Sequence, residues 1–168
     1  MLEMVAAIAV LMIGVVAVAQ LVPFSMTLNS DNRHSSAAMV IAQRQLDGLI
    51  DQPISATTLT DPQGILCPVG NICNLGNPAL PRQVVGSPVI MSGVRPVIDF
   101  SQAQIAGYGF NYTDADDASS PVYDIRWAVI TFANAGGSAS GRRFIVGVRV
   151  LGGRAPLLPV NVDSMVEK

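Results

Sequence analysis

The stretch Met4–Leu21, MVAAIAVLMIGVVAVAQL, contains no charged side chain, and Gln20 is its only amide. A helix that crosses a bilayer needs about 20 predominantly apolar residues. The stretch therefore predicts a helix that is apolar on all sides. Glu3 is the only charged residue among residues 1–30, and it lies at the edge of this run. A charge beside an apolar helix is costly, and such charges usually have a function.

Three interpretations of this segment are open. A cleaved signal peptide could use Ala17–Ala19 as its small-residue site, but signal peptides begin with positive charge and this chain carries Glu3 there. A single-span membrane anchor explains the length of the segment but gains nothing from Glu3. An apolar helix that leaves the membrane and packs against copies of itself explains its all-round apolar surface.

A second helical pattern follows the polar stretch 25–36. Its stripe recurs at steps of three and four residues and consists of Ala38, Ile41, Ala42, Gln45, Leu46 and Leu49. Such spacing is typical of a helix with one covered face. Pro53 ends the pattern, because the residue before a proline disfavours helix. We expect one helix from Leu2 to about Asp51, roughly 75 Å long at 1.5 Å per residue. Pro23 should kink this helix or melt it locally, because proline removes a backbone hydrogen bond.

Composition excludes several classes of protein. The chain has 168 residues and a net charge of −2, with 50% hydrophobic and 13% charged residues. This length fits one domain, or one domain with an appendage. A disordered chain would be poor in apolar residues and rich in charge. Asp and Glu (12) outnumber Lys and Arg (10), so no basic surface for nucleic acid is expected.

The C-terminal part of the sequence predicts antiparallel strands. Residues 123–132 and 143–151 alternate apolar with other residues at period two, which is typical of half-buried strands. In the first of these, we expect Asp124 and Arg126 on the side away from the core. Residues 133–142 contain three glycines and predict the tip of a hairpin between the two strands. Weaker strands are expected at 84–91 and 94–100, and a short edge strand at 160–162.

These elements predict an α+β fold. A long N-terminal α-helical spine, kinked near Pro23, would pack on a small antiparallel β-sheet head. The helix would occupy residues 1–52, with an apolar segment at 1–24 and an amphipathic half at 25–52. Residues 53–168 would form the globular head.

The residues of the N-terminal segment resemble the start of a known family. Leu2–Gly14, LEMVAAIAVLMIG, is similar to the N-terminus of type IV pilin-like proteins, most of all minor pilins of the PilV kind and the pseudopilins of type II secretion. Residues 42–47 also resemble the later helix of that group. Residues 123–132 and 144–150 resemble its closing hairpin. The N-terminal resemblance covers about the first 50 residues.

The resemblance implies an assembly pathway. Subunits would be held in the bacterial inner membrane by the apolar helix, processed by a prepilin peptidase and methylated. An assembly platform would then extract them into an extracellular helical filament of identical or homologous pilins. In the family, the glutamate equivalent to Glu3 pairs with the N-terminal amine of a neighbouring subunit. We assign Glu3, Gly14 and Pro23 to this assembly segment.

This sequence departs from the family at its start. The family's precursor carries a short basic leader that ends in glycine, and its mature chain usually begins with phenylalanine. Neither is present here. Alignment on the Leu2–Glu3 step places the family's first mature residue about two positions before Met1.

The two cysteines, Cys67 and Cys73, enclose a loop of five residues. In an extracytoplasmic chain a disulfide is the expected state of such a pair, and the alternative is two reduced thiols. A zinc site needs about four ligands, and the chain has only two cysteines and one histidine. The disulfide would contribute about 2 kcal/mol because it closes a short ring.

Other polar clusters give weaker signals. Asp114, Asp116 and Asp117 are candidate calcium ligands, with a solvated acidic turn as the alternative. His34 with its neighbouring serines does not form a catalytic triad, since adjacent helical residues point in different directions. Trp127 is expected in the core, with a surface contact as the alternative. We therefore expect no enzyme and no cofactor.

The sequence predicts a structural subunit of a type IV pilus-like filament or fimbrium. The alternative is a monomeric, single-span protein of the periplasm or cell surface that binds a partner. The same residues are compatible with a role in adhesion, motility, DNA uptake or secretion.

Overall fold

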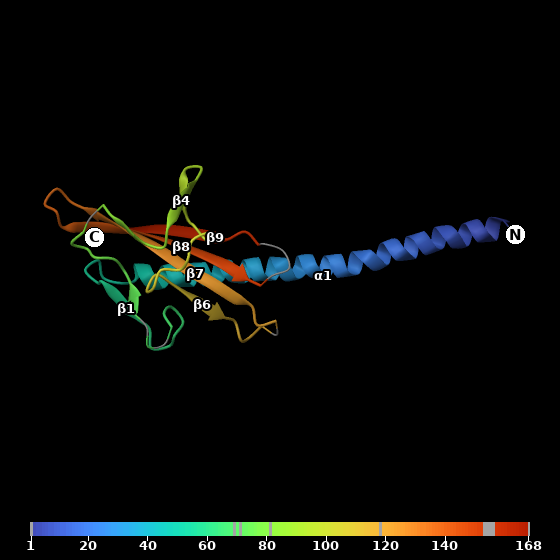
Figure 1. The fold of residues 1–168 in the computed structure, drawn as a ribbon, viewed down its shortest axis with the longest axis horizontal. Coiled ribbons are helices and arrows are strands. Elements are labelled where there is room, and N and C mark those ends of the chain that lie inside the picture. Colours follow the sequence, from blue (N-terminus) through green and yellow to red (C-terminus); the bar gives the residue numbers. More distant parts are fainter. Residues whose placement is uncertain are drawn as a thin grey trace. The chain divides into compact units, whose positions relative to one another are not determined.

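The computed structural model describes residues 2–68, 70, 72–80, 82–117, 119–152 and 157–167. One helix, α1 (Leu2–Ile50), opens the chain. The strands that follow are β1 (Thr58–Thr60), β2 (Ile72–Asn74), β3 (Val84–Gly86), β4 (Val89–Ser92), β5 (Arg95–Ile98), β6 (Gly109–Thr113), β7 (Val122–Ala133), β8 (Ala139–Leu151) and β9 (Val160–Glu167). The predicted combination of one long apolar helix with antiparallel sheets is confirmed (Figure 1).

The chain divides into two compact units. The first, here called the helical unit, consists of residues 1–34, and its described residues, 2–34, are all helical. The second, here called the head, consists of residues 35–168 and includes the last part of α1 with all the strands. The amphipathic half of the helix therefore contributes to the core of the head.

Helix α1 runs without interruption through Pro23, so the expectation of local melting there was wrong. Proline removes one backbone donor. The hydroxyls of Ser25 and Thr27 add local hydrogen bonds, donating to the carbonyls of Val22 and Pro23 at 2.9 Å each. The kink expected at Pro23 stays a prediction.

The main sheet of the head is antiparallel and is centred on the long hairpin β7–β8. Its order is β3-β7-β8-β9, and β6 also pairs with β7. Strands β6 and β3 share the same edge of β7, because β6 pairs with residues 122–126 and β3 with residues 128–130. The predicted strands 123–132 and 143–151 are confirmed. The edge strand expected at 160–162 is the start of the longer β9.

One face of this sheet packs against the predicted stripe of α1. All six residues of the stripe are buried, as are Tyr123, Ile125, Trp127 and Val129 of β7. All of these residues except Gln45 belong, with residues of β8, to one hydrophobic cluster. The indole Nε1 of Trp127 donates to the carbonyl of Asn74 at 2.9 Å. Trp127 is therefore a core residue, and the alternative of a surface contact was wrong.

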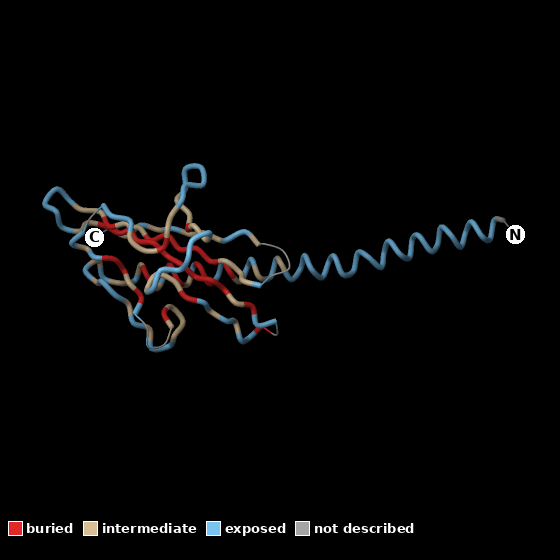
Figure 2. The backbone as a smooth tube through the Cα atoms, in the orientation of Figure 1, coloured by how far each residue is buried: buried red, intermediate tan, exposed pale blue. Residues whose placement is uncertain are grey.

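The opposite face of the sheet is also covered over part of its length, which the sequence analysis did not predict. Asp124 and Arg126 were expected to point to solvent, but they are only 2% and 4% exposed. Phe100 and residues that follow it lie over them, and Ile98 packs on Ala128 and Ile145. The buried residues of the head thus form a central layer with covers on two sides (Figure 2).

We expect Leu49→Ala to destabilise the head by about 2–5 kcal/mol, because it leaves a cavity where a fully buried side chain packs. Val40→Ala is the matched control: it lies on the same helix but is 63% exposed, so we expect a change within about 0.5 kcal/mol. Denaturant titration of the detergent-solubilised chain, followed by fluorescence of the single tryptophan, measures both. Equal effects from the two variants would contradict this packing.

Candidate assembly surface

The helical unit presents an apolar surface on every side. Every described side chain from Glu3 to Ser30 is exposed. Leu11 and Ile13, which are two residues apart and so lie on nearly opposite sides of the helix, are 66% and 71% exposed. Soluble monomers rarely expose contiguous apolar patches larger than a few hundred Å². This surface therefore requires a cover of lipid or of other protein helices.

The helix is long and apolar enough to span a membrane. Within Glu3–Ile50, an 18-residue window reaches a mean hydropathy of 2.7, and none of that window is buried. A span near the N-terminus can anchor a chain in a bilayer. This property is consistent with a membrane-bound stage, whatever covers the helix later.

Glu3 and Gly14 are distinctive positions on this surface. Glu3 lies in the first turn of α1, where a negative charge is favourable because the helix dipole is positive at that end. Gly14 leaves a shallow apolar depression between Val10, Leu11 and Val18. A side chain at Gly14 would meet nothing within 4 Å, so packing inside this chain does not require glycine there.

A disulfide closes a loop that packs on α1 within the head. Cys67 and Cys73 are bonded to each other, with Cα atoms 5.8 Å apart, and both are buried. The side chain of Gln45 on α1 donates to the carbonyl of Leu66 at 3.0 Å. A side chain at Gly48 would overlap the end of the Leu66 side chain, which would have to shift.

Asp61 organises the chain that enters this loop. Its carboxylate accepts the backbone N–H groups of Leu66 and Ile65 at 2.6 Å each and of Gln63 at 2.9 Å. The hydrogen bond from Leu66 and the two others lower the pKa of the Asp61 carboxyl. The Asp61 carboxylate thus fixes the segment that leads into the loop, and the disulfide closes the loop itself.

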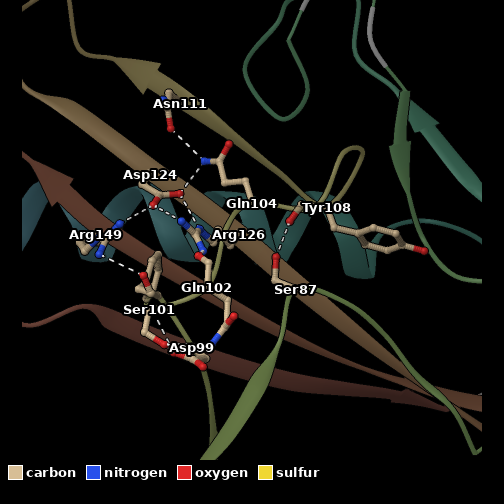
Figure 3. Close-up of polar contacts among 11 residues, drawn as sticks. Ser87, Asp99, Ser101, Gln102, Gln104, Tyr108, Asn111, Asp124, Arg126 and Arg149 are labelled. Carbon is tan, nitrogen blue, oxygen red and sulfur yellow. Dashed lines mark hydrogen bonds and ion pairs between the residues drawn. The ribbon is translucent and has the colours of Figure 1, made fainter.

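A buried polar cluster fastens residues 99–104 over the other face of the sheet (Figure 3). The carboxylate of Asp124 accepts from Arg126 Nε and Nη2 at 2.9 and 2.8 Å and from Arg149 Nη2 at 3.0 Å. Gln104 donates to the same carboxylate at 2.6 Å. Both guanidinium groups lie over the ring of Phe100, with their central carbons 5.0 and 4.9 Å from its centroid. Arg126 Nη1 also donates to the carbonyl of Gln102 at 2.6 Å.

The charge state of this cluster follows from its contacts. Burial alone would raise the pKa of the Asp124 carboxyl, but the hydrogen bonds from Arg126, Gln104 and Arg149 hold it below its usual range. Asp124 is therefore ionised at neutral pH, and every strong contact it makes is to a donor. The cluster therefore joins strands β7 and β8 to residues 99–104 through charged hydrogen bonds.

A shallow pocket of about 390 Å³ lies elsewhere on the head. Among the described residues, its lining consists of hydroxyl, amide, glycine and phenol groups, from Thr57, Thr58, Asn74, Gly76, Asn77 and Tyr108. Burial raises the pKa of the Tyr108 hydroxyl, so it stays protonated at neutral pH. The pocket thus carries no pair of groups that could exchange a proton at neutral pH.

The remaining candidate residues lie in the acidic segment 114–117 of the head and on α1. Asp117 accepts from the backbone and hydroxyl of Ser119 at 2.9 and 2.8 Å, while Asp114 accepts from the N–H of Asp116 at 3.2 Å. Within the described ranges, no three His, Cys, Asp or Glu side chains converge as metal ligands. His34 lies on α1, in the helical unit.

Sequence reasoning also missed a buried charge outside the Asp124 cluster. Arg142 on β8 is 1% exposed and donates through Nη1 to the carbonyl of Ala56 at 2.6 Å. Burial lowers the pKa of its guanidinium. Alternation along β8 places Arg142 on the same face as Phe144 and Val146, and this position was the one sign in the sequence that its side chain would be buried.

Comparison of this chain with protein families, with curated proteins and with solved structures gives no match. Its function must therefore be argued from the surfaces described above.

We expect Asp124→Asn to destabilise the head by about 3–5 kcal/mol at pH 7, because Arg126 and Arg149 lose the charge that compensates them. The pKa of Asp124 is lower in the folded chain than in the unfolded chain. Its contribution to the free energy of unfolding is therefore fully present above the pKa of an unfolded aspartate, about 4. That contribution is lost as the pH falls through the lower pKa of the folded state. Stability of the variant should therefore fall less steeply on acidification than that of the natural chain. Urea titrations between pH 7 and 3 measure this, with Asp116→Asn as the exposed control.

We expect Cys67→Ser with Cys73→Ser to lower stability by about 2 kcal/mol, because the unfolded chain regains the freedom of the open loop. The double variant should also lose its response to reductant in a denaturant titration. A natural chain whose midpoint does not change with reductant would contradict a stabilising disulfide.

Proposed function

We propose that this chain is a structural subunit of an extracellular, type IV pilus-like filament, in which the helical unit packs against the helical units of other copies. The observation that carries the proposal is the all-round exposure of an apolar helix with a single carboxylate at its start. Before assembly the same helix would lie in the inner membrane. Processing by a prepilin peptidase and extraction by an assembly platform follow from the family resemblance.

Burial of this helix among its copies supplies the driving force for assembly. Apolar surface removed from water contributes roughly 25 cal/mol per Å². In the membrane, lipid already keeps this surface away from water, so the hydrophobic effect alone does not favour leaving the bilayer. Close packing between helices must therefore supply additional free energy. Gly14 supports such contacts, because its missing side chain lets a neighbouring helix approach closely.

Glu3 distinguishes the filament from its main alternative, a monomeric membrane-anchored binding protein. A single-span anchor needs the length and hydropathy that α1 provides, and the neutral polar pocket near Tyr108 would be its natural binding site. Such an anchor would tolerate loss of Glu3. A carboxylate buried among packed helices instead needs a positively charged partner, which in a filament is the N-terminal amine of a neighbouring copy.

We expect Glu3→Ala to lower the amount of chain in sheared surface filaments by at least about tenfold, because the neighbouring cation would be left buried and unpaired. The head should still fold, as shown by formation of the Cys67–Cys73 disulfide in the membrane fraction. Asp31→Ala is the matched control: it removes a carboxylate from the same helix outside the apolar run. A normal filament yield from Glu3→Ala would contradict the proposal.

A further inference from the structure

The hairpin β4–β5 ends in an apolar tip that stands away from the rest of the head (Figure 1). Its base is anchored, since Ile98 is buried against Ala128 and Ile145. Beyond the base, residues 90–95 are all exposed (Figure 2). Val94 at the turn is 92% exposed and Met91 is 65% exposed. An apolar tip held out on an anchored hairpin is poorly placed to stabilise its own chain.

The tip carries one charge. Arg95 is the only charged residue between Val84 and Ile98, and it is exposed. The hairpin therefore presents Ile90, Met91 and Val94 together with a single positive group. A surface that complements it would be apolar with a negative charge beside the apolar part.

The head offers such a surface on the sheet face that the base of the hairpin packs against, beyond the part that the hairpin covers. Register places Val84, Ile130, Arg143 and Met165 in one row across β3, β7, β8 and β9. Ile130 packs with the cluster of Ile98, Ala128 and Ile145. The row therefore lies on the same face of the sheet as the base of the hairpin, which covers a neighbouring part of that face. Val84 and Met165 are 56% and 47% exposed, so the row is only partly covered.

The charge of this open row is negative at its β9 end. Arg143 is already paired with Asp163, with nitrogen and oxygen 2.7 Å apart. Glu167 is exposed on β9, opposite Gly141 in the next row. A side chain built on Gly141 would lie 3.3 Å from Glu167 and 3.7 Å from Met165, so both point to this same face.

We propose that the β4–β5 tip of one copy docks on this open row of a neighbouring copy, with Val94 near Met165 and Arg95 facing Glu167. The proposal rests on the proposed function and names a contact between heads in the filament. The tip and the row are different surfaces of one chain, so the contact is head-to-tail, the kind that builds an open filament when successive copies do not close into a ring.

A copy of this chain explains the charges better than a lipid surface does. Anionic lipid would complement Arg95 but would repel Asp163 and Glu167 of the same head. The contact is also small: stable interfaces bury about 800 Å² on each partner, more than one hairpin tip can supply. It therefore adds to helix packing, and its loss should reduce assembly without abolishing it.

Cysteine cross-linking tests the contact directly. The chain's two cysteines are paired with each other, so Val94→Cys or Met165→Cys introduces a single free thiol. Filaments containing both variants are treated with copper phenanthroline and oxygen, which accept the two electrons and two protons released as a disulfide forms. We expect a linked dimer from the mixture and at most a trace from either variant alone.

Each other outcome contradicts the contact. Linked dimers from Val94→Cys alone would show that hairpin tips meet each other. Intact filaments without cross-links would overturn this contact and leave the filament standing. A chain found only as membrane monomers, without cross-links, would overturn both proposals. If brominated lipid in those membranes quenched a dye attached to the new thiol of Val94→Cys, the tip would be assigned to the bilayer.

A charge exchange tests the pairing of Arg95 with Glu167. We expect Arg95→Glu and Glu167→Arg each to lower the yield of sheared filaments about fivefold, as loss of an exposed ion pair allows. The double variant should recover most of that yield. Arg95→Lys keeps the positive charge at the tip and serves as the control. Equal loss in the double variant and the single variants would overturn the pairing.

Discussion

The structure depends on one constraint, which is that the apolar surface of residues 4–28 has to be covered. Every described side chain there is exposed, and the described part of the chain has one helix that could cross a membrane. Lipid can cover such a surface, and so can other helices. The difference lies in Glu3, because a carboxylate at the edge of an apolar helix is stabilised by a fixed positive partner and not by lipid tails.

The second half of the same helix has only one apolar face to cover, and the head covers it within the same chain. Residues 35–50 have one apolar face, and the β7–β8 hairpin covers it. A disulfide loop and Asp61 hold the chain that leaves α1, and the Asp124 cluster fastens a second cover on the far side of the sheet. These devices stabilise the head by itself, which a subunit needs if its helix exchanges lipid for protein neighbours.

The helix and the central hairpin could be predicted because their patterns repeat over many residues. The stripe from Ala38 to Leu49 and the alternation in β7 each report one buried face. Alternation cannot tell whether a second segment covers the other face, which is why the burial of Asp124 and Arg126 was missed. Strands β1 and β2 have three residues each, too few for a periodic signal. Strand β6 was not predicted, because the glycines and the asparagine around Phe110 are typical of loops. Phe110 and Tyr112 are two residues apart, as the apolar residues of a half-buried strand would be.

The candidate assembly surface was visible in the sequence as an uncharged run with one acidic residue, but the sheet face proposed to accept a neighbour was not. That face depends on register, since Val84, Ile130 and Met165 are far apart in the chain and adjacent only across strands. Electron cryomicroscopy of sheared surface filaments tests the central claim most directly. The account predicts a core in which residues 4–28 of each copy contact the same residues of other copies. A chain recovered only from the membrane, as a monomer whose helix is surrounded by lipid, would contradict it.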